Sequence, residues 1–62
     1  MRIEDLREYE GKEVKVRLRN GKVLSGKLNL QRSVVLIVYN GGRRGSLILP
    51  QEIVEIEVIA DE

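Results

Sequence analysis

The sequence contains no cysteine, histidine, tryptophan or phenylalanine, and it has a single proline. The absence of cysteine and histidine excludes disulfides, the common zinc sites and enzymes whose nucleophile or base is one of these residues. Ser25, Ser33 and Ser46 have no base beside them, and the carboxylates are not clustered as a metal site requires. No glycine-rich phosphate-binding motif precedes a helix. We therefore expect no enzymatic activity, no cofactor and no bound metal.

Long hydrophobic segments are also absent. The longest apolar run, Val34 to Tyr39, is far shorter than the roughly 18 residues that indicate a membrane-spanning helix. The first ten residues, MRIEDLREYE, lack the apolar core of a signal peptide. These features predict a soluble, cytoplasmic protein with no membrane partner.

The small size of the chain limits how it can be stabilised. Its 62 residues are expected to form one domain, residues 1–62. A domain of this size buries only about 60% of the surface of its unfolded chain, and small domains usually add disulfides, a metal or association with other subunits. Because the first two are excluded, the sequence predicts self-association.

The net charge is only +1, but the two signs of charge are separated along the chain. All ten acidic residues lie outside residues 14–49. This separation has two interpretations: a cationic surface for a polyanion, or strands whose opposite charges face each other within and between subunits. The basic residues of the acid-free segment are Lys15, Arg17, Arg19, Lys22, Lys27, Arg32, Arg43 and Arg44.

The spacing of apolar residues predicts one short helix followed by five strands. Ile3, Leu6 and Tyr9 recur at helical spacing, and Gly11 can end the helix in the left-handed conformation. From Val14 onward, apolar residues recur at every second position, as in strands with one buried face. The predicted elements are a helix at about residues 3–10 and strands at about residues 13–19, 22–31, 33–40, 44–49 and 53–59.

Turn and glycine positions indicate how these strands are arranged. Asn20-Gly21 is a strong hairpin signal, because both residues tolerate the positive φ of a type I′ turn. Gly26 interrupts the second strand and predicts a sharp bend or a close backbone approach. The run Val34 to Tyr39 has no polar face and is expected to be buried on both sides. Five short, bent strands close most economically into a barrel. We predict an all-β fold: a small, strongly bent five-stranded barrel with a short N-terminal helix.

Two segments resemble the Sm-like family, which comprises the Sm, LSm and Hfq proteins. Val14 to Leu28, VKVRLRNGKVLSGKL, resembles the first Sm signature, a hydrophobic alternation followed by Gly, a hydrophobic residue, Gly and Leu. Leu47 to Ile56, LILPQEIVEI, is similar to the second signature, in which one strand ends, a tight turn follows and the last strand begins. Asn20-Gly21 followed by Val34 to Ile37 is similar to Hfq in register. The resemblance covers nearly the whole chain.

The resemblance implies an SH3-like barrel that assembles with copies of itself. The fourth strand would pair with the fifth strand of a neighbour, and the subunits would close a hexameric or heptameric ring. The apolar surplus of the third and fourth strands independently favours such a partner. The acidic residues of the last strand have an alternative place beside the basic residues of their own barrel. The expected interface residues are Val34, Leu36, Val38, Leu47, Ile48, Leu49, Ile53, Glu55 and Glu57.

The resemblance also implies binding of single-stranded RNA by the loop after the second strand and the turn before the last. Arg32, Ser33, Pro50 and Gln51 would surround the pore, with Arg43 and Arg44 assisting. Each has a simpler interpretation, since the arginines can be solvated loop cations and Gln51 can bond its own turn.

The sequence departs from the family at these positions. The Sm aspartate and asparagine positions fall on Arg32 and Leu36, and the polar residue and aromatic platform of Hfq fall on Ser33 and Val34. The basic pair of the second loop falls on Pro50-Gln51, so a cation is missing there. These departures put RNA binding by the family's usual contacts in doubt.

Two functions therefore remain open at this point. The first is an Sm-like ring that binds uridine-rich or non-specific single-stranded RNA, which the acid-free segment 14–49 favours. The alternative is a structural, self-assembling oligomer, natural or designed, that keeps the Sm-like fold and binds no ligand. The departures from the family's RNA-binding residues favour this alternative. A third hypothesis, an SH3-like monomer that binds a peptide, is weakened because Tyr9 and Tyr39 are the only aromatic residues.

Overall fold

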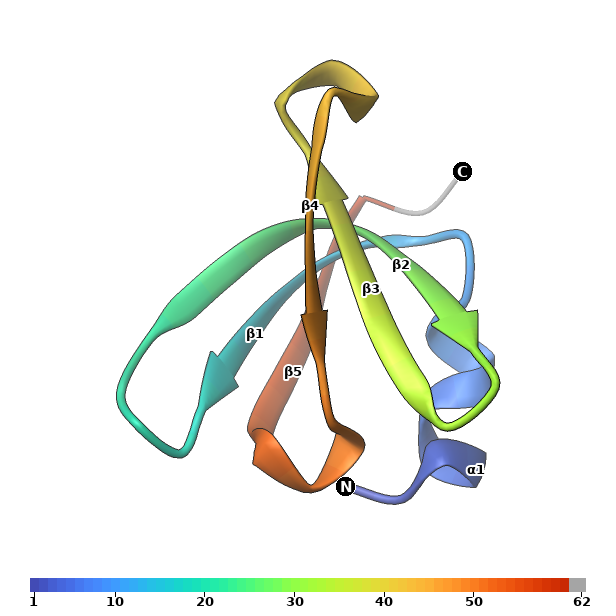
Figure 1. Cartoon of the computed structure of the whole chain (residues 1–62), viewed down its shortest axis with the longest axis vertical. Coiled ribbons are helices and arrows are strands. Elements are labelled where there is room, and N and C mark those ends of the chain that lie inside the picture. The colour runs from blue at the N-terminus through green and yellow to red at the C-terminus, as the bar shows by residue number, and fades with distance from the viewer. Residues whose placement is uncertain (61–62) are drawn as a thin grey trace.

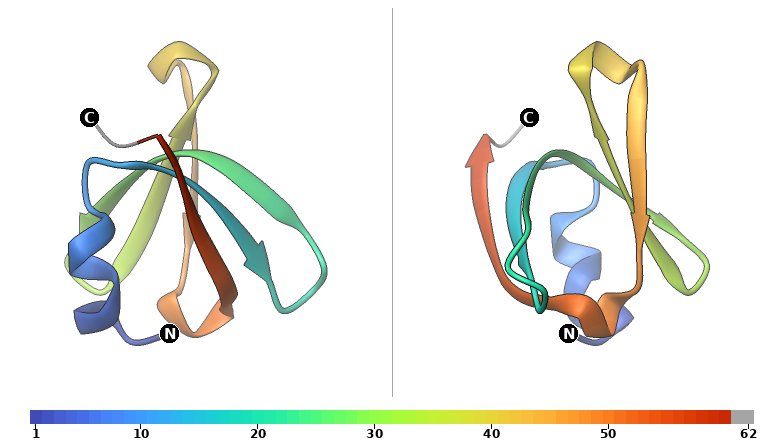
Figure 2. Two further views of the ribbon diagram at one scale, coloured as in Figure 1. Left: turned by 180° about the vertical axis from the view of Figure 1, so that it is seen from behind. Right: turned by 60° about the vertical axis from the view of Figure 1, so that its left-hand side comes forward.

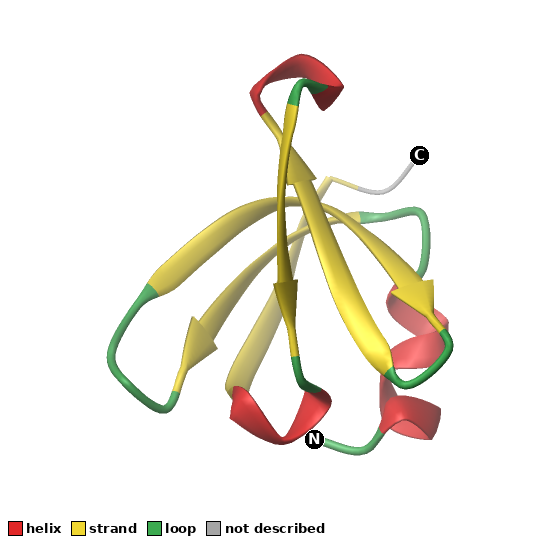
Figure 3. Cartoon of the chain, viewed as in Figure 1, coloured by secondary structure: helices red, strands yellow, loops and turns green. Residues whose placement is uncertain are grey.

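The computed structural model describes residues 1–60 and contains a short helical segment followed by five strands (Figure 3). The strand ends lie within one residue of their predicted positions. A mostly β architecture with a short N-terminal helix is thereby confirmed. The elements are α1 (Ile3–Leu6), η1 (Arg7–Tyr9), β1 (Glu13–Leu18), β2 (Val23–Gln31), β3 (Val34–Tyr39), η2 (Asn40–Gly42), β4 (Arg44–Ile48), η3 (Pro50–Glu52) and β5 (Ile53–Ala60), where η denotes a 3₁₀ turn.

The N-terminal segment packs onto the sheet through its apolar side. Leu6 is fully buried, and Ile3 and Tyr9 are half-buried against the same core. The single helix expected over residues 3–10 ends instead in the 3₁₀ turn η1, a common way for a helix to tighten at its C-terminus. Gly11 follows with a φ of 83°, and its N–H donates to the Leu28 carbonyl at 2.9 Å. The predicted left-handed glycine therefore connects the helical segment to β2.

All five strands belong to one antiparallel sheet with the order β4-β3-β2-β1-β5. β4 and β5 form the opposite edges of this sheet, yet only residues 49–52 connect them in the chain. Such a short connection requires the sheet to curl until its two edges approach each other at η3 (Figure 1). The curl encloses the hydrophobic core.

Gly26 permits the close approach of β2 and β3 that the sequence predicts. A Cβ atom at this position would overlap with the Val38 carbonyl oxygen and would lie 3.1 Å from Ile37 Cγ2. The obstacle includes backbone atoms, which cannot move aside as the end of a flexible side chain can. Only glycine fits here without displacing β3.

The β1–β2 turn differs from the prediction. Gly21 has a φ of 90°, but Asn20 is not among the described residues with positive φ, so the predicted type I′ turn is wrong. Gly21 N–H donates to the Leu18 carbonyl at 3.0 Å, and Leu18 N–H donates to the Lys22 carbonyl at 2.8 Å. This pattern is typical of a three-residue hairpin loop that ends in a left-handed glycine. The Asn20 side chain accepts from Lys22 N–H at 2.9 Å, so it stabilises the loop without a left-handed backbone.

β5 pairs with β1 through an irregular register. The register shifts near both ends of β1, which leaves Val54 and Ile59 without a residue opposite them. Extra residues of this kind are β-bulges, which bend a strand and increase its twist. The bulges help β5 to follow the curl of the sheet.

The sheet does not close into a barrel within this chain. Among residues 1–60, no backbone pairing joins β4 to β5. β4 ends and β5 begins beside η3, and the two strands diverge with distance from it (Figure 2, right). Residues 1–60 therefore leave the outer edges of β4 and β5 unpaired.

The core lies inside the curl and is entirely aliphatic. β1 contributes by strict alternation, with its apolar residues buried and its charged residues exposed. No polar or charged side chain is buried in the described part of the chain. The buried residues are Leu6, Val14, Val16, Leu18, Leu28, Val35, Ile37, Ile48 and Ile53.

Candidate functional site

The two loops predicted to bind RNA lie at the same end of the molecule. β3 and β4 are antiparallel, with Val35 opposite Ile48. The turn before β3, Arg32-Ser33, therefore lies at the same end as η3, which follows β4 and carries Pro50 and Gln51 (Figure 1). We call Arg32, Ser33 and Gln51 the end site. Their arrangement results from the pairing of neighbouring strands rather than from closeness in the chain.

The three residues of the end site are exposed, whereas Pro50 is buried. The Pro50 carbonyl accepts a hydrogen bond from the Met1 amino group at 2.8 Å. Proline is well suited to the first position of a helical turn, because its φ is preset and its missing N–H has no partner there. Pro50 thus shapes η3 and has little surface left for RNA.

Arg32 has a strained backbone conformation. Its φ is 57°, which is the single positive φ among the described non-glycine residues. Gln31 and Val34 pair directly across the turn, so Arg32 occupies the first position of a two-residue loop, where glycine is the usual residue for a positive φ. Holding a non-glycine residue in this region costs about 1 kcal/mol or more. Strain of this kind is common at functional sites, where it serves to present a side chain.

Hydrogen bonds hold η3 in place beneath Gln51. The Glu52 carboxylate accepts from Leu49 N–H at 2.8 Å, and Glu52 N–H donates to the Leu49 carbonyl at 2.9 Å. Arg19 N–H donates to the Glu52 carbonyl at 2.8 Å, which joins η3 to the β1–β2 turn. Gln51 is therefore displayed on a turn that is bonded on both sides.

Arg43 and Arg44 lie at the other end of the molecule. They directly follow η2, which is at the top of Figure 1, whereas η3 is at the bottom. Both arginines are exposed. Within one subunit the structure does not bring them to the end site, with which they were predicted to act.

The apolar residues predicted at the subunit interface occupy two different environments, the core and the outer face of the sheet. Ile48 and Ile53 have their side chains in the core, so only their backbone is available to a partner. The remaining apolar residues lie on the outer face, where Leu47 is 67% exposed and stands opposite Leu36. The outer face of β3 is half-buried rather than fully buried, because no element covers it. We call this surface the edge patch: Val34, Leu36, Val38, Leu47 and Leu49.

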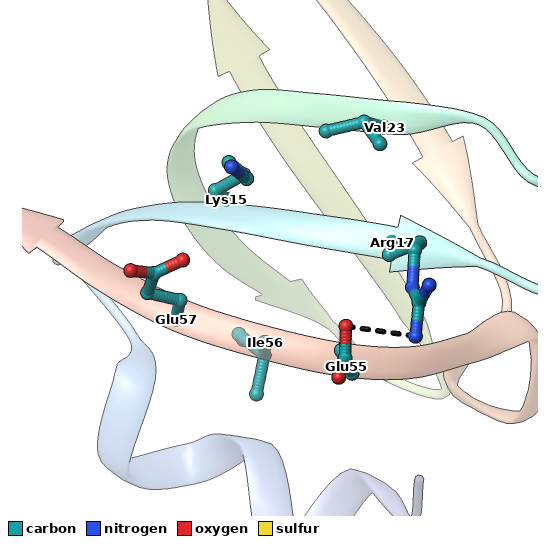
Figure 4. Close-up of a pocket in the computed structure, with 6 residues that line it drawn as sticks. All are labelled: Lys15, Arg17, Val23, Glu55, Ile56 and Glu57. Carbon is teal, nitrogen blue, oxygen red and sulfur yellow. Dashed lines mark ion pairs between the residues drawn. The ribbon is translucent and has the colours of Figure 1, made fainter.

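Glu55 and Glu57 lie on the outer face of β5, beside β1. The Glu55 carboxylate is 2.9 Å from Arg17 Nη2, and Glu57 stands opposite Lys15 (Figure 4). The alternative placement of these acids, beside the basic residues of their own subunit, is therefore confirmed for Arg17 and Lys15. They border a groove of about 390 Å³ that runs over β1.

The sequence did not predict the exposed apolar residues of β5. Val54 and Ile59 are each 48% exposed, and Val58 is also exposed. The adjacent apolar pairs Ile53-Val54 and Val58-Ile59 interrupt the alternation of the strand, and this interruption was the available signal for the two bulges. The open edges at β4 and β5 both therefore carry exposed apolar side chains.

A second groove, of about 380 Å³, lies on the outer face near η2. Apart from Val38, its residues were not predicted as site residues. They come together where β2 passes close to β3 at Gly26. The sequence predicted a bend or a close approach at Gly26, but not which segment would lie beside it. The groove is lined by Glu13, Ser25, Gly26, Lys27, Val38, Tyr39, Gly41 and Gly42.

Residues 1–60 contain neither a metal-binding cluster nor a membrane-spanning helix. No group of three or more acidic, histidine or cysteine side chains is placed to hold a metal ion. No helix in this part of the chain has the length and apolar character needed to cross a membrane.

Comparisons with known proteins found no matching family model, no similar curated protein and no similar solved structure.

Proposed function

We propose that this chain is an Sm-like subunit that assembles into a homo-oligomeric ring and binds single-stranded RNA at the end site. In this assembly β4 of one subunit pairs with β5 of the next, which completes each curled sheet as a barrel. The observation that carries the proposal is the pair of unpaired edges at β4 and β5. Unpaired strand edges expose a row of N–H and C=O groups that another strand can satisfy.

The distribution of exposed apolar residues supports pairing at these edges. Seven large hydrophobic residues are exposed in the described part of the chain, and five of them lie on or directly beside β4 and β5. Burying such side chains on association is favourable at about 25 cal/mol per Å² of apolar surface. The five are Leu47, Leu49, Val54, Val58 and Ile59.

The two edges belong to different surfaces of the subunit. A contact between β4 of one copy and β5 of the next is head-to-tail, and head-to-tail contacts form closed rings when the rotation between subunits closes. A ring repeats the end site once per subunit, so several weak RNA contacts act together.

The chemistry of the end site fits single-stranded RNA. Arg32 can bind phosphate with its guanidinium group, and the Gln51 amide can donate to and accept from the edge of a base. Ser33 adds a hydroxyl group that can bond a phosphate or a ribose. None of these side chains is used by an ion pair or hydrogen bond elsewhere in residues 1–60.

The test is fluorescence anisotropy of labelled oligo(U) and oligo(A) titrated with protein at several salt concentrations. We expect saturable binding that weakens with salt. Arg32→Gln should lower the slope of log K against log salt by about 0.7 for each phosphate that the arginine neutralises. Gln51→Ala should weaken binding with little change in that slope. Lys15→Gln, which removes an exposed cation from the outer face of β1, is the matched control and should bind as the unmodified protein does.

A structural oligomer without a ligand is the second candidate function. The burial of Pro50 and the distance of Arg43 and Arg44 from the end site favour it, because they reduce the number of groups that can contact RNA there. A ring that leaves both RNAs free at low salt would support this candidate and reject the RNA-binding proposal.

A further inference from the structure

The outer face of β3 and β4 is an apolar surface that no element of residues 1–60 covers. Leu47 of β4 is 67% exposed and stands opposite Leu36 of β3. Leu36 leans over Gly45, since a Cβ atom built on Gly45 would lie 3.0 Å from Leu36 Cδ1. β3 and β4 lie at the front in Figure 1, whereas α1 lies at the front in the view from behind (Figure 2, left). The edge patch is therefore one continuous surface across two strands, on the side away from the helix.

Assembly through the strand edges would leave much of the edge patch uncovered. Pairing of β4 with β5 of a neighbour extends the sheet in its own plane, where strands lie about 4.8 Å apart, whereas side chains project above and below that plane. β3 lies one strand in from the free edge of β4. Leu36 and Val38 on its outer face would thus remain open to a partner in every subunit of a ring.

The backbone of β3 restricts the kind of segment that can cover the patch. β3 is paired on both sides, with β2 and with β4, so its outer face offers side chains and no free row of N–H and C=O groups. An extended segment lying on this face would leave its own backbone groups unpaired in an apolar contact, which is costly. A helix pairs its backbone internally and packs on a sheet through a stripe of apolar side chains. The patch therefore fits a helix.

The charged residues on β2, β3, β4 and the turns between them are all basic. Lys27 stands beside the patch, opposite Val38 of β3. Arg32 lies in the turn before β3, and Arg43 and Arg44 follow the turn after it, so exposed cations stand at both ends of the patch. This rim attracts an acidic partner and repels a basic one.

Two acids lie at the border of the patch and do not reverse its charge. Glu13 of β1 stands opposite Lys27, on the strand beyond it, and the Glu52 carboxylate accepts from Leu49 N–H. Four cations thus face two acids, and a second copy docked face to face would set one cationic rim against another. The patch has no aromatic side chain, since Tyr39 packs against the core, so it offers bases no stacking surface. An acidic protein segment fits this surface better than a second copy or RNA.

We propose that the edge patch binds an acidic amphipathic helix of another protein. Apolar side chains spaced i, i+3, i+4 and i+7 pack on Leu36, Val38 and Leu47, and acidic residues beside them face the cationic rim. From Val34 to Val38, β3 advances by roughly 13 Å at about 3.3 Å per residue, a length that about nine helical residues match at 1.5 Å each. This inference goes beyond RNA binding and ring assembly, because it uses the face of β3 and not the end site or the strand edges.

The test is fluorescence anisotropy of a labelled synthetic helix of about 18 residues, with leucines at i, i+3, i+4 and i+7 and glutamates beside them. Two control peptides carry lysines in place of the glutamates, or the same composition in shuffled order. We expect saturable binding of the acidic helix that weakens with salt, and affinities lower by about tenfold or more for both controls. Equal binding of the three peptides, or no saturable binding of the acidic one, would overturn the proposal.

Two pairs of variants assign the contacts. Leu36→Thr should lower the affinity for the acidic helix by about tenfold, because threonine offers less apolar surface and still suits a strand. Val23→Thr is its matched control, since Val23 is exposed on β2 outside the part that pairs with β3, and it should bind as the unmodified protein does. Lys27→Gln should reduce the salt dependence of binding, whereas Lys15→Gln on β1 should not. An unchanged affinity in Leu36→Thr would contradict the assigned contact.

The same variant separates this inference from the proposed function. Leu36→Thr should keep the mass in solution and the affinity for oligo(U) of the unmodified protein. A loss of mass in Leu36→Thr would show that the patch is a subunit contact and would overturn the docking proposal. If the unmodified protein forms a ring and binds oligo(U) but leaves the acidic helix free, the proposed function stands and the docking proposal is rejected. Binding of the acidic helix by a protein that leaves oligo(U) free would support docking alone.

Other occupants of the patch give different results. Binding of vesicles of phosphatidylcholine and phosphatidylglycerol that is lost in Leu36→Thr, with no binding of the acidic helix, would assign the patch to a membrane surface and reject the proposal. Loss of oligo(U) binding in Leu36→Thr, again with no binding of the helix, would assign the patch to RNA and reject it equally.

Discussion

At the scale of single residues, backbone conformation links the fold to the end site. Arg32 occupies a left-handed position at the β2–β3 turn, where glycine would be relaxed. Gln31 and Val34 flank the turn and pair with each other, so Arg32 and Ser33 must join them as a two-residue loop. The chain thus keeps a strained arginine at an exposed tip, which is consistent with a role in binding.

We predict that Arg32→Gly stabilises the fold by about 0.5–1 kcal/mol, because glycine adopts a φ of 57° without strain. The gain is partly offset by the greater freedom of glycine in the unfolded chain. Urea denaturation at matched protein concentrations measures the change. Ser33→Gly is the control, since Ser33 has no positive φ, and it should be neutral or destabilising. Destabilisation by Arg32→Gly would show that the turn is not strained at this residue.

Gly26 is the residue on which the close approach of β2 and β3 depends. We predict that Gly26→Ala destabilises the fold by about 2–4 kcal/mol, because its methyl group would overlap with the backbone of Val38. Ser25→Ala, at the exposed neighbouring position, should change stability by less than about 0.5 kcal/mol. Denaturation curves of the two variants make the comparison. Similar stabilities would mean that the strands do not approach as closely as described.

At the scale of elements, charges on the outer face of β1 and β5 select the register of that pair. The Arg17–Glu55 pair is exposed, with 53% and 68% of the two side chains accessible, so its contribution to stability is small. The bulges at Val54 and Ile59 make the register of β5 irregular, and a residue slip would bring Glu55 away from Arg17. The charges therefore matter more for alignment than for stability.

We predict that Arg17→Glu lowers the free energy of unfolding by about 0.5–1 kcal/mol, because it places two acids opposite each other. The double variant Arg17→Glu/Glu55→Arg should recover most of this loss. Measuring all members of the cycle at low and high salt gives the coupling, which should shrink as salt screens the pair. A double variant no more stable than Arg17→Glu would argue against the direct contact.

How much of the structure could be predicted from the sequence also differs between elements. β1 was readily predicted, because its valines alternate with charged residues and only one face can be buried. The run Val34 to Tyr39 has no period, so the sequence could not show that Val35 and Ile37 face the core while Leu36 faces outward. Ile48 lies in a similarly apolar segment, Leu47 to Leu49, and was predicted at the interface for the same reason. Its pairing with Val35 of β3 buries its side chain in the core.

The candidate sites depended even more on long-range structure. The placement of the two turns of the end site at one end of the molecule follows from the predicted order of strands, and the antiparallel pairing of β3 and β4 confirms that placement. The groove near η2 could not, because Gly26 predicted a bend or a close approach but not that η2 would lie beside Lys27. The type of the β1–β2 turn was predicted wrongly, because Asn20 does not adopt the positive φ that a type I′ turn requires. Its side chain instead accepts a hydrogen bond from Lys22 N–H.

At the scale of the whole molecule, the open edges of the sheet account for the hydrophobic side chains that are exposed along β4 and β5. A chain of 7.1 kDa with an entirely aliphatic core and no disulfide has little stability to spare. Its exposed hydrophobic side chains concentrate along β4 and β5, the strands that have one edge without a partner. Pairing these edges between copies would bury those side chains and satisfy both backbones, so assembly and folding support each other.

The central claim, assembly through the edges of β4 and β5, is tested most directly by the mass of the protein in solution. Light scattering across a range of concentrations should give about six or seven times 7.1 kDa for the unmodified chain. Leu47→Lys places a charge in the edge patch and should yield a folded monomer or a much weaker oligomer. Val23→Lys is the matched control, because Val23 is exposed but lies away from both edges, and it should keep the full mass. A mass of 7.1 kDa for the unmodified chain at every concentration, or equal masses for Leu47→Lys and Val23→Lys, would contradict this account.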